Sequence, residues 1–287
     1  MKILVTGAAG QLGNAIREAS MKSSNEFLFT DICQCSDVLS LDITKAKDVA
    51  EFIKEYSIDL IINCVAYTDV DKAEDEVEQA ELLNSKAPEI LAKISLEQDI
   101  TLVHISTDYV FDGEGDRPYK EDSLAFPKTV YGRTKLAGEQ AIINSGCKYL
   151  IFRTAWLYGT SGKNFVKTIL RLLNEKPLIK VVNDQFGSPT YAGDIADALV
   201  KIIDKGLFNT GLYHYTNEGI CSWYEFAKAI ADISGSQTPV YACTTDEFPS
   251  KARRPHYSVL DKTKFKSTFK IEIPHWEVSL RRHLVTI

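Results

Sequence analysis

A threonine, a tyrosine and a lysine near the middle of the chain have the types and spacing needed to deliver a proton to a carbonyl oxygen. Thr107 ends the segment TLVHIST, and Tyr131 and Lys135 lie four residues apart in VYGRTK. On a helix this spacing places both side chains on one face. A nearby ammonium favours the phenolate and lowers the pKa of a phenol from its usual value of about 10. We expect Tyr131 to protonate a carbonyl oxygen, Lys135 to tune it, and Thr107 to donate to the same oxygen.

The spacing Y-x-x-x-K alone is common and also fits an exposed pair on an ordinary helix. A glycine turn near the N-terminus makes the chemical interpretation more specific. VTGAAGQLG spaces Gly7, Gly10 and Gly13 three residues apart between an expected strand and an expected helix. Backbone without side chains can approach a pyrophosphate there, and a helix N-terminus offers unpaired N–H groups. The alternative, a turn needed only for strand–helix packing, is less favoured.

Asp31 bears on the choice of dinucleotide. It ends the expected strand EFLFTD, where a carboxylate can accept the ribose hydroxyls of a cofactor bound at the glycine turn. A carboxylate there repels a 2′-phosphate, and no Arg or Lys follows within several residues. The sequence alone therefore favours NAD or dual use.

The elements that must position these residues alternate along the first two-thirds of the chain. Short apolar runs such as KILVTG and DLIINCVA are separated by helix-like segments, which predicts an α/β fold with a doubly wound parallel sheet of the Rossmann type. A break is expected at Pro88 within the helix-like run 79–98, and YLIFRTAWLYG is expected to be one strand. After about residue 160 the alternation loosens, and a smaller second domain is expected from several C-terminal segments.

Composition excludes several classes of protein. The 287 residues are 45% hydrophobic and 25% charged with a net charge of −6, which argues against a nucleic-acid partner. No apolar run approaches the roughly 18 residues of a membrane span, and MKILVTGAAG is too short and broken for a signal peptide. Six scattered cysteines are typical of reduced thiols in a cytoplasmic protein. Cys33 and Cys35 form a C-x-C pair that ordinary thiols explain better than zinc.

Taken in order, six motifs carry a family resemblance: TGAAGQLG, NCVAYTDVDKAE, STDYVFDG, YGRTKLAGE, RTAWLYG and NDQFGSPTYAGDIA. Together they resemble the extended short-chain dehydrogenases, and within them the dTDP-4-dehydrorhamnose reductases. The resemblance spans nearly the whole chain. It implies NADPH- or NADH-dependent reduction of the 4-keto group of dTDP-4-dehydro-β-L-rhamnose, which yields dTDP-β-L-rhamnose for surface polysaccharide.

The resemblance also implies roles for residues and segments. Residues 1–155, with returning segments near 180–218, would form the NAD(P)-binding domain, and residues 156–287 mainly the substrate-binding domain. Thr107, Tyr131 and Lys135 would be catalytic, and the sugar would contact Thr107, Asp108 and Trp156. The cofactor-binding set would comprise Gly7, Gly10, Gln11, Leu12, Gly13, Asp31, Asp42, Ile43, Ala66, Tyr67, Thr68, Ile105, Tyr131 and Lys135.

Several alternatives stay open. Members of this family often accept NADPH as well as NADH, so Asp31 does not decide the cofactor. Some are homodimers bridged by Mg²⁺ through carboxylates that include an early helix position, and this chain has Ala15 there, which leaves dimer and metal in question. A sugar-nucleotide epimerase or dehydratase would use the same dinucleotide chemistry. A non-catalytic regulatory subunit would keep the fold without the reaction.

Other conspicuous residues admit two interpretations. Trp156 fits core packing and sugar stacking about equally well. Arg253 and Arg254 fit a diphosphate clamp or ordinary surface arginines equally well. The carboxylate-rich run 68–81 favours a solvated helix face, and Asp194 favours a helix N-cap. The five histidines show no spacing typical of metal ligands and are interpreted as structural.

Overall fold

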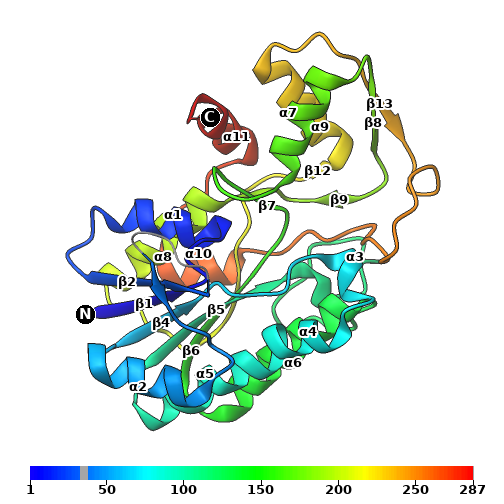
Figure 1. Ribbon diagram of the computed structural model, residues 1–287. Coiled ribbons are helices and arrows are strands. Elements are labelled where there is room, and N and C mark those ends of the chain that lie inside the picture. Colours follow the sequence, from blue (N-terminus) through cyan, green and yellow to red (C-terminus); the bar gives the residue numbers. More distant parts are fainter. Residues whose placement is uncertain (33–37, 287) are drawn as a thin grey trace.

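The computed structural model describes residues 1–32 and 38–286. Its described part has two lobes (Figure 1). The lower lobe is built on a sheet whose strand order is β11-β6-β5-β4-β1-β2-β3, with every pair parallel. These strands are β1 (Lys2–Thr6), β2 (Glu26–Asp31), β3 (Leu39–Ser40), β4 (Leu60–Asn63), β5 (Thr101–Thr107), β6 (Lys148–Thr154) and β11 (Gly211–His214). The expected α/β class with a parallel, Rossmann-type sheet is confirmed.

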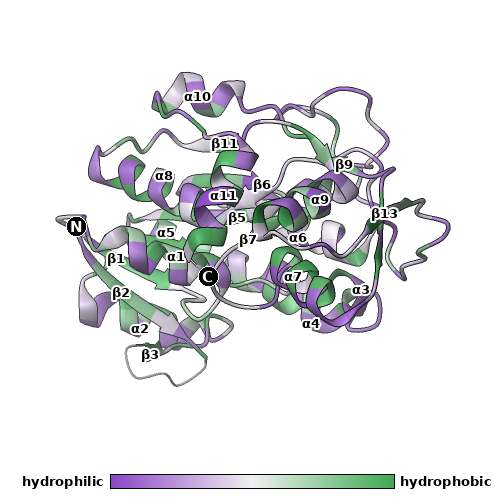
Figure 2. Cartoon of the chain, turned by 90° about the horizontal axis from the view of Figure 1, so that it is seen from above, coloured by the Kyte–Doolittle hydropathy of each residue, from purple (hydrophilic) through white to green (hydrophobic). Residues whose placement is uncertain are grey.

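Helices cover both faces of this sheet because successive residues of each strand point to opposite sides. Ile3 and Val5 pack with helices α1, α8 and α10, while Leu4 between them packs with α2, α5 and α6. Figure 2 shows the apolar colour concentrated where these layers meet. The helices are α1 (Gln11–Ser20), α2 (Ala46–Tyr56), α5 (Ala87–Glu97), α6 (Val130–Ser145), α8 (Ala192–Asp204) and α10 (Thr263–Phe269).

The upper lobe has a smaller core of its own. Its buried residues come mainly from three helices, with Phe226 and Trp276 among the largest. The elements are β7 (Leu157–Tyr158), α7 (Phe165–Glu175), β8 (Ile179–Val182), β9 (Phe186–Gly187), β10 (Thr190–Tyr191), β12 (Cys221–Ser222), α9 (Trp223–Ser234), β13 (Val240–Cys243) and α11 (Trp276–Thr286). β8 pairs with β13, β7 with β10, and β9 with β12. The boundaries proposed for two domains stay a prediction.

Local signals explain where several helices begin. Ser222 accepts a hydrogen bond from the backbone N–H of Glu225 at 3.1 Å, and the Glu225 carboxylate accepts one from the N–H of Ser222 at 2.7 Å. These two bonds form a reciprocal capping box. Thr129 caps α6 in the simpler way, by accepting from the N–H of Gly132 at 3.0 Å.

Three local expectations are wrong. The helix-like run does not break at Pro88, because the proline sits in the first turn of α5, where a residue without a backbone N–H is tolerated. The irregularity in the run is instead a π turn at Leu82–Lys86, which follows α4 (Val77–Glu81). The strand after residue 148 is interrupted at Trp156, whose φ of 50° is left-handed. Asp194 lies inside α8, and Tyr191 takes the N-cap position.

Candidate active site

The glycine turn lies at the carboxyl ends of β1 and β4, where the winding of the sheet reverses direction. Gly7 has a φ of 70°, and a Cβ there would lie 2.9 Å from the Cys64 carbonyl carbon. A Cβ on Gly13 would lie 2.4 Å from the Gly7 oxygen. These glycines let β1, α1 and β4 meet at a crevice of the kind that binds dinucleotides. Gly10, at the N-cap of α1, is exposed.

Among the other residues expected to bind cofactor, Asp31 and Gln11 have contacts that place them next to the glycine turn. Asp31 accepts a hydrogen bond from the backbone N–H of Ala9 at 3.0 Å, so β2 brings it directly beside the glycine turn. Gln11 is half-buried and accepts from Asn164 of the upper lobe at 3.0 Å. Leu12 and Ile43 are buried, and Asp42 is half-buried. Hydrogen bonds from Thr44 hold the pKa of Asp42 below its usual value.

The segment after β4 follows the same edge of the sheet. Ala66 and Tyr67 are half-buried, and Thr68 is exposed. The amide of Asn84, in the π turn, accepts from the N–H of Tyr67 at 2.8 Å and donates to its carbonyl at 3.1 Å. These bonds hold the segment in place.

Thr107, Tyr131 and Lys135 are brought together, as their spacing suggested. Thr107 ends β5, while Tyr131 and Lys135 lie in the first two turns of α6. The Thr107 hydroxyl lies close enough to the Tyr131 phenol to affect its pKa. The Thr107 hydroxyl also donates to Asp108 at 3.0 Å and accepts from the N–H of Tyr109 at 3.2 Å. In this arrangement its proton is directed to Asp108 rather than outward.

The electrostatics of this group differ from the expectation in one respect. Burial raises the pKa of Tyr131, and the neighbouring Thr107 side chain opposes that rise. The expected lowering by Lys135 is therefore wrong for this structure, since the Lys135 ammonium nitrogen donates instead to the Ile105 carbonyl at 2.6 Å. Burial also lowers the pKa of Lys135 to about 8, against the opposing effect of Glu139.

Asp108 is 4% exposed, and burial raises its pKa to about 6 although Ser258 and Thr107 hydrogen bond to it. A buried carboxyl with such a pKa beside a tyrosine is typical of a functional site.

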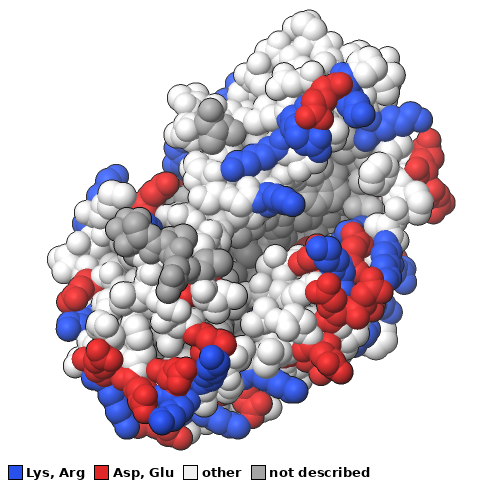
Figure 3. All heavy atoms as spheres, viewed as in Figure 1, with Lys and Arg blue, Asp and Glu red and all other residues white. Residues whose placement is uncertain are grey.

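Trp156 stands on the upper-lobe side of the opening. Its ring stacks on Trp223 with centroids 3.5 Å apart and planes 10° apart. A Cβ on Gly187 would lie 2.6 Å from Trp156 Cε2, so the indole is confined on that side as well. Figure 3 shows a deep hollow between the lobes, with Lys and Arg side chains on the upper lobe beside it.

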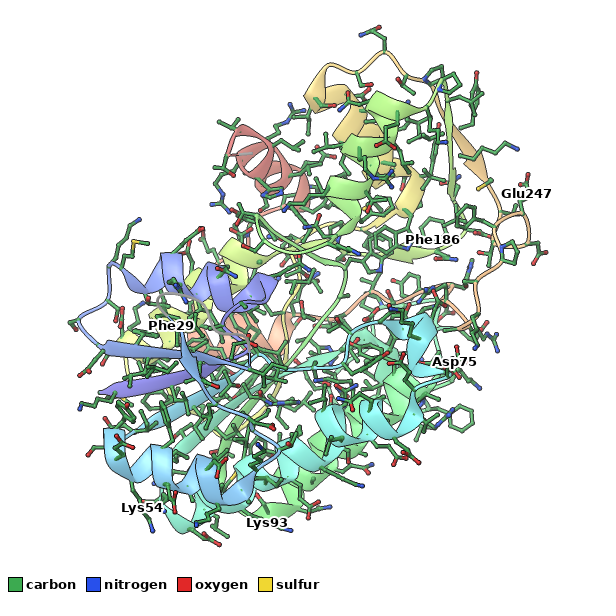
Figure 4. The ribbon with its side chains drawn as sticks, viewed as in Figure 1. Phe29, Lys54, Asp75, Lys93, Phe186 and Glu247 are labelled. Carbon is green, nitrogen blue, oxygen red and sulfur yellow. The ribbon has the colours of Figure 1, made fainter. Side chains whose placement is uncertain are left out.

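The segment 249–257, here called the connector, crosses between the lobes next to this hollow. Arg254 pairs with Asp71 and donates to the Tyr109 hydroxyl at 3.2 Å, while Arg253 pairs with Glu114. Lys251 pairs with Asp75, which Figure 4 labels on the lower lobe. The run 68–81 is therefore more than a solvated face, because two of its carboxylates, Asp71 and Asp75, hold the connector.

Sequence reasoning missed several polar residues that support the site. Asn63 and His104 are buried in the sheet beneath Lys135, and Asn84 holds the segment after β4. No spacing in the sequence marks these residues, because their partners lie on other strands. The network of Asp194 with Asn217, Ser279 and Arg282, which ties α8 to α11, was equally hidden.

Other expected features fall elsewhere. Cys33 and Cys35 lie outside the described residues, and Cys64, Cys147, Cys221 and Cys243 are free thiols. Within residues 1–32 and 38–286, no group of three or more His, Cys, Asp or Glu is placed to hold a metal ion, and Ala15 is buried in α1. Across the same residues, no helix is both long and apolar enough to cross a membrane.

Comparison with known proteins decides the family. A family model described as the RmlD substrate binding domain matches residues 1–287. The chain belongs to the RmlD family. The resemblance found in the sequence is thereby confirmed, and the chain is an oxidoreductase of that family.

Three relatives illustrate the similarity. The spore coat polysaccharide biosynthesis protein SpsK of Bacillus subtilis (strain 168) is 40% identical over 283 residues, 99% of this chain and 96% of the relative. The dTDP-4-dehydrorhamnose reductase of Escherichia coli (strain K12) is 39% identical over 297 aligned positions, 99% of this chain and 97% of that protein. The crystal structure of dTDP-4-dehydrorhamnose reductase from Bacillus anthracis in complex with NADP is 38% identical with a TM-score of 0.91, covering 100% and 99% of the two chains.

Proposed function

We propose that this protein reduces the 4-keto group of dTDP-4-dehydro-β-L-rhamnose to give dTDP-β-L-rhamnose, with NADPH or NADH as the reductant, in the synthesis of surface polysaccharide. The observation that carries the proposal is the grouping of Thr107, Tyr131 and Lys135 at the carboxyl edge of the sheet. A full-length relative with 39% identity bears the name of this reductase, which supports the same substrate.

The residues of the crevice fit a dinucleotide. Gly7 and Gly13 leave a backbone cradle that a Cβ would fill, and the N-terminus of α1 opens onto it. We assign the pyrophosphate to Gly7, Gly10, Gln11, Leu12 and Gly13, the ribose to Asp31, and the adenine to Asp42 and Ile43. Ala66, Tyr67, Thr68 and Ile105 would line the path to the nicotinamide. Bound there, the reduced cofactor supplies the hydride.

The cofactor type is left to measurement. Asp31 beside the glycine turn favours NADH, because a carboxylate repels a 2′-phosphate. The relative from Bacillus anthracis was solved with NADP, which supports use of NADPH. We propose that the chain accepts both.

The chain's own residues would act on the keto oxygen. Tyr131, whose pKa burial keeps high, holds its proton until negative charge develops on that oxygen and then gives it up. Thr107 stands beside the phenol, and Asp108 fixes the Thr107 hydroxyl by accepting a hydrogen bond from it. Lys135 would bind the nicotinamide ribose, and Trp156 would pack on the sugar. In this proposal residues 1–155 and 180–218 mainly bind cofactor, and 156–287 mainly bind substrate.

The test is a stoichiometric assay with the purified chain. The keto sugar is generated from dTDP-glucose by a dehydratase and an epimerase, either NADPH or NADH is added, and absorbance at 340 nm is followed. One reduced cofactor consumed for each dTDP-rhamnose formed, with the product identified by NMR, is the expected result. Product without net oxidation would indicate an epimerase instead. Dinucleotide binding without turnover would favour a regulatory subunit, or a different nucleotide sugar.

A further inference from the structure

A line of buried polar side chains runs through the sheet beneath Lys135, and the reaction proposed above does not use it. Asn63 on β4, His104 on β5 and Lys135 on α6 are each at most 1% exposed. The amide Nδ2 of Asn63 lies 3.1 Å from Nδ1 of His104, and Nε2 of His104 lies 3.3 Å from Nζ of Lys135. Buried polar groups in such a line must match donors to acceptors.

The first link in the line is fixed by a backbone donor. The N–H of Val65 points at Asn63 Oδ1 at 3.1 Å, and a backbone N–H can only donate. The Thr6 hydroxyl donates to the same oxygen at 2.8 Å. The opposite orientation of the amide would set Nδ2 against the N–H of Val65. The Nδ2 group therefore faces His104, and it acts as the donor to Nδ1.

The second link follows from the first. Because Nδ1 of His104 accepts, a neutral ring must carry its proton on Nε2. Burial, with a smaller effect from Lys135, holds the pKa of His104 well below 6.5, so the ring is neutral. An N–H donor therefore points from His104 at the nitrogen of Lys135.

That donor discriminates between the two forms of Lys135. A neutral amine has a lone pair that accepts the Nε2–H, whereas an ammonium meets it donor to donor. The bond from Nζ to the Ile105 carbonyl at 2.6 Å is available to both forms. Tyr131 lies one turn before Lys135 on α6, and it keeps its proton because burial raises its pKa. The other titratable groups facing Lys135 are Cys64, whose pKa burial raises to about 12, and Glu139, which is already paired with Arg153 at 2.6 Å.

We propose that His104, held by Asn63 in its Nε2–H form, is a positioning residue that sets the protonation state of Lys135 and keeps its nitrogen at the Ile105 carbonyl. The inference deepens the proposed function, because Lys135 is the residue assigned to the nicotinamide ribose. Its effect adds to that of burial, which lowers the pKa of Lys135 to about 8, and it favours the amine form over the ammonium.

The first experiment reads the tautomer directly. Nitrogen-15 NMR of the full chain with labelled histidine is recorded between pH 6 and 9, and His104 is identified among the five histidines by its loss in His104→Gln. An unprotonated Nδ1 with a protonated Nε2 is expected. A protonated Nδ1, or an imidazolium ion, would overturn the proposal.

The second experiment follows Lys135 by carbon-13 NMR of the lysine Cε groups, with its signal identified by Lys135→Met. In His104→Gln the side-chain amide can turn its oxygen to the ammonium, so the titration midpoint of Lys135 is expected to rise by about one pH unit. The control His275→Gln alters an exposed ring and is expected to leave the midpoint in place. An unchanged midpoint in folded His104→Gln contradicts the inference.

A second variant covers the case in which His104→Gln does not fold. Asn63→Asp replaces the donor facing Nδ1 by an acceptor, so the ring is expected to move its proton to Nδ1, visible as an exchange of the two nitrogen signals. Retention of the Nε2–H tautomer of His104 in this variant would contradict the proposal. These measurements need no turnover, so failure of the reductase assay leaves them interpretable. If the assay succeeds, the pH profile of kcat/KM is expected to shift with the Lys135 midpoint.

Discussion

In the lower lobe Thr107 stands at the end of a seven-residue parallel strand, whereas in the upper lobe Trp156 stands beside strands of two residues. Thr107 is placed by a seven-residue strand paired on both sides. The position of Trp156 is set by its left-handed backbone, by stacking on Trp223, and by Gly187, which has no side chain to collide with the indole. The first arrangement tolerates little change in the backbone, and the second depends on side-chain packing. Substitutions in the two lobes are therefore expected to have different consequences.

The largest effect is expected for Gly13→Ala in the lower lobe. The added Cβ would lie 2.4 Å from the Gly7 oxygen and 2.6 Å from Ala8 Cα, and neither backbone atom can move away. We expect the free energy of unfolding to fall by about 3 kcal/mol and dinucleotide affinity to fall by at least about tenfold. Chemical denaturation and cofactor titration measure the two quantities.

Gly146→Ala is the matched control for that substitution. Gly146 has a φ of 81° with nothing within 4 Å of its added Cβ, so only the left-handed backbone is penalised, at about 1 kcal/mol. Equal losses in the two variants would show that the crowding at Gly13 has no influence.

The dependence of stability on pH tests the environment of His214, a buried residue on β11 at one edge of the sheet. Burial, together with the nearby Arg153 guanidinium, lowers the pKa of His214 on β11 to about 3. Below pH 6.5 the unfolded chain binds a proton at His214, whereas the folded chain does not. The free energy of unfolding is therefore highest above pH 6.5 and falls as the pH is lowered toward 3. The expected slope is about 1 kcal/mol per pH unit.

His214→Gln removes this titration. Denaturation at pH 4 and pH 7 is expected to show a smaller difference in unfolding free energy for this variant than for the wild type. The same difference in both proteins would mean that groups other than His214 cause the loss of stability at low pH.

In the upper lobe, Gly187→Ala tests the placement of Trp156. The added Cβ would lie 2.6 Å from the indole, which cannot retreat because Trp223 stacks against its plane. We expect KM for the sugar nucleotide to rise by about tenfold, equivalent to about 1.4 kcal/mol, while KM for the cofactor stays the same. A rise in both constants would mean that the two lobes are not functionally separate.

The smallest effects are expected at the connector. Arg254 and Asp71 are partly exposed, at 25% and 41% of the side chain, and such pairs contribute less than about 1 kcal/mol. Because Asp71 already pairs with the Arg254 guanidinium, Arg254→Gln and Asp71→Asn are expected to change the KM for the sugar nucleotide equally, by about twofold or less. A much larger rise in Arg254→Gln alone would instead identify a diphosphate clamp.

The contrast between the lobes also separates what the sequence could predict from what it could not. The strand–helix alternation and the meeting of Thr107, Tyr131 and Lys135 follow from local periodicity and from the rule that parallel strands end at one edge. His104 and Asn63 could not be found this way, because their partners lie on other elements. The direction of the Tyr131 pKa depends on burial, and the turn at Trp156 on contacts with Gly187 and Trp223, which only the folded chain brings together.

Whether Tyr131 supplies the proton to the sugar's keto oxygen is tested most directly by comparing Tyr131→Phe with the wild type in the 340 nm assay. Tyr56→Phe, on the outer helix α2, is the matched control. With folding and dinucleotide affinity verified, we predict that Tyr131→Phe lowers kcat by about 10²- to 10⁴-fold and that Tyr56→Phe retains the wild-type rate. A Tyr131→Phe variant that oxidises cofactor as fast as the wild type would contradict the account.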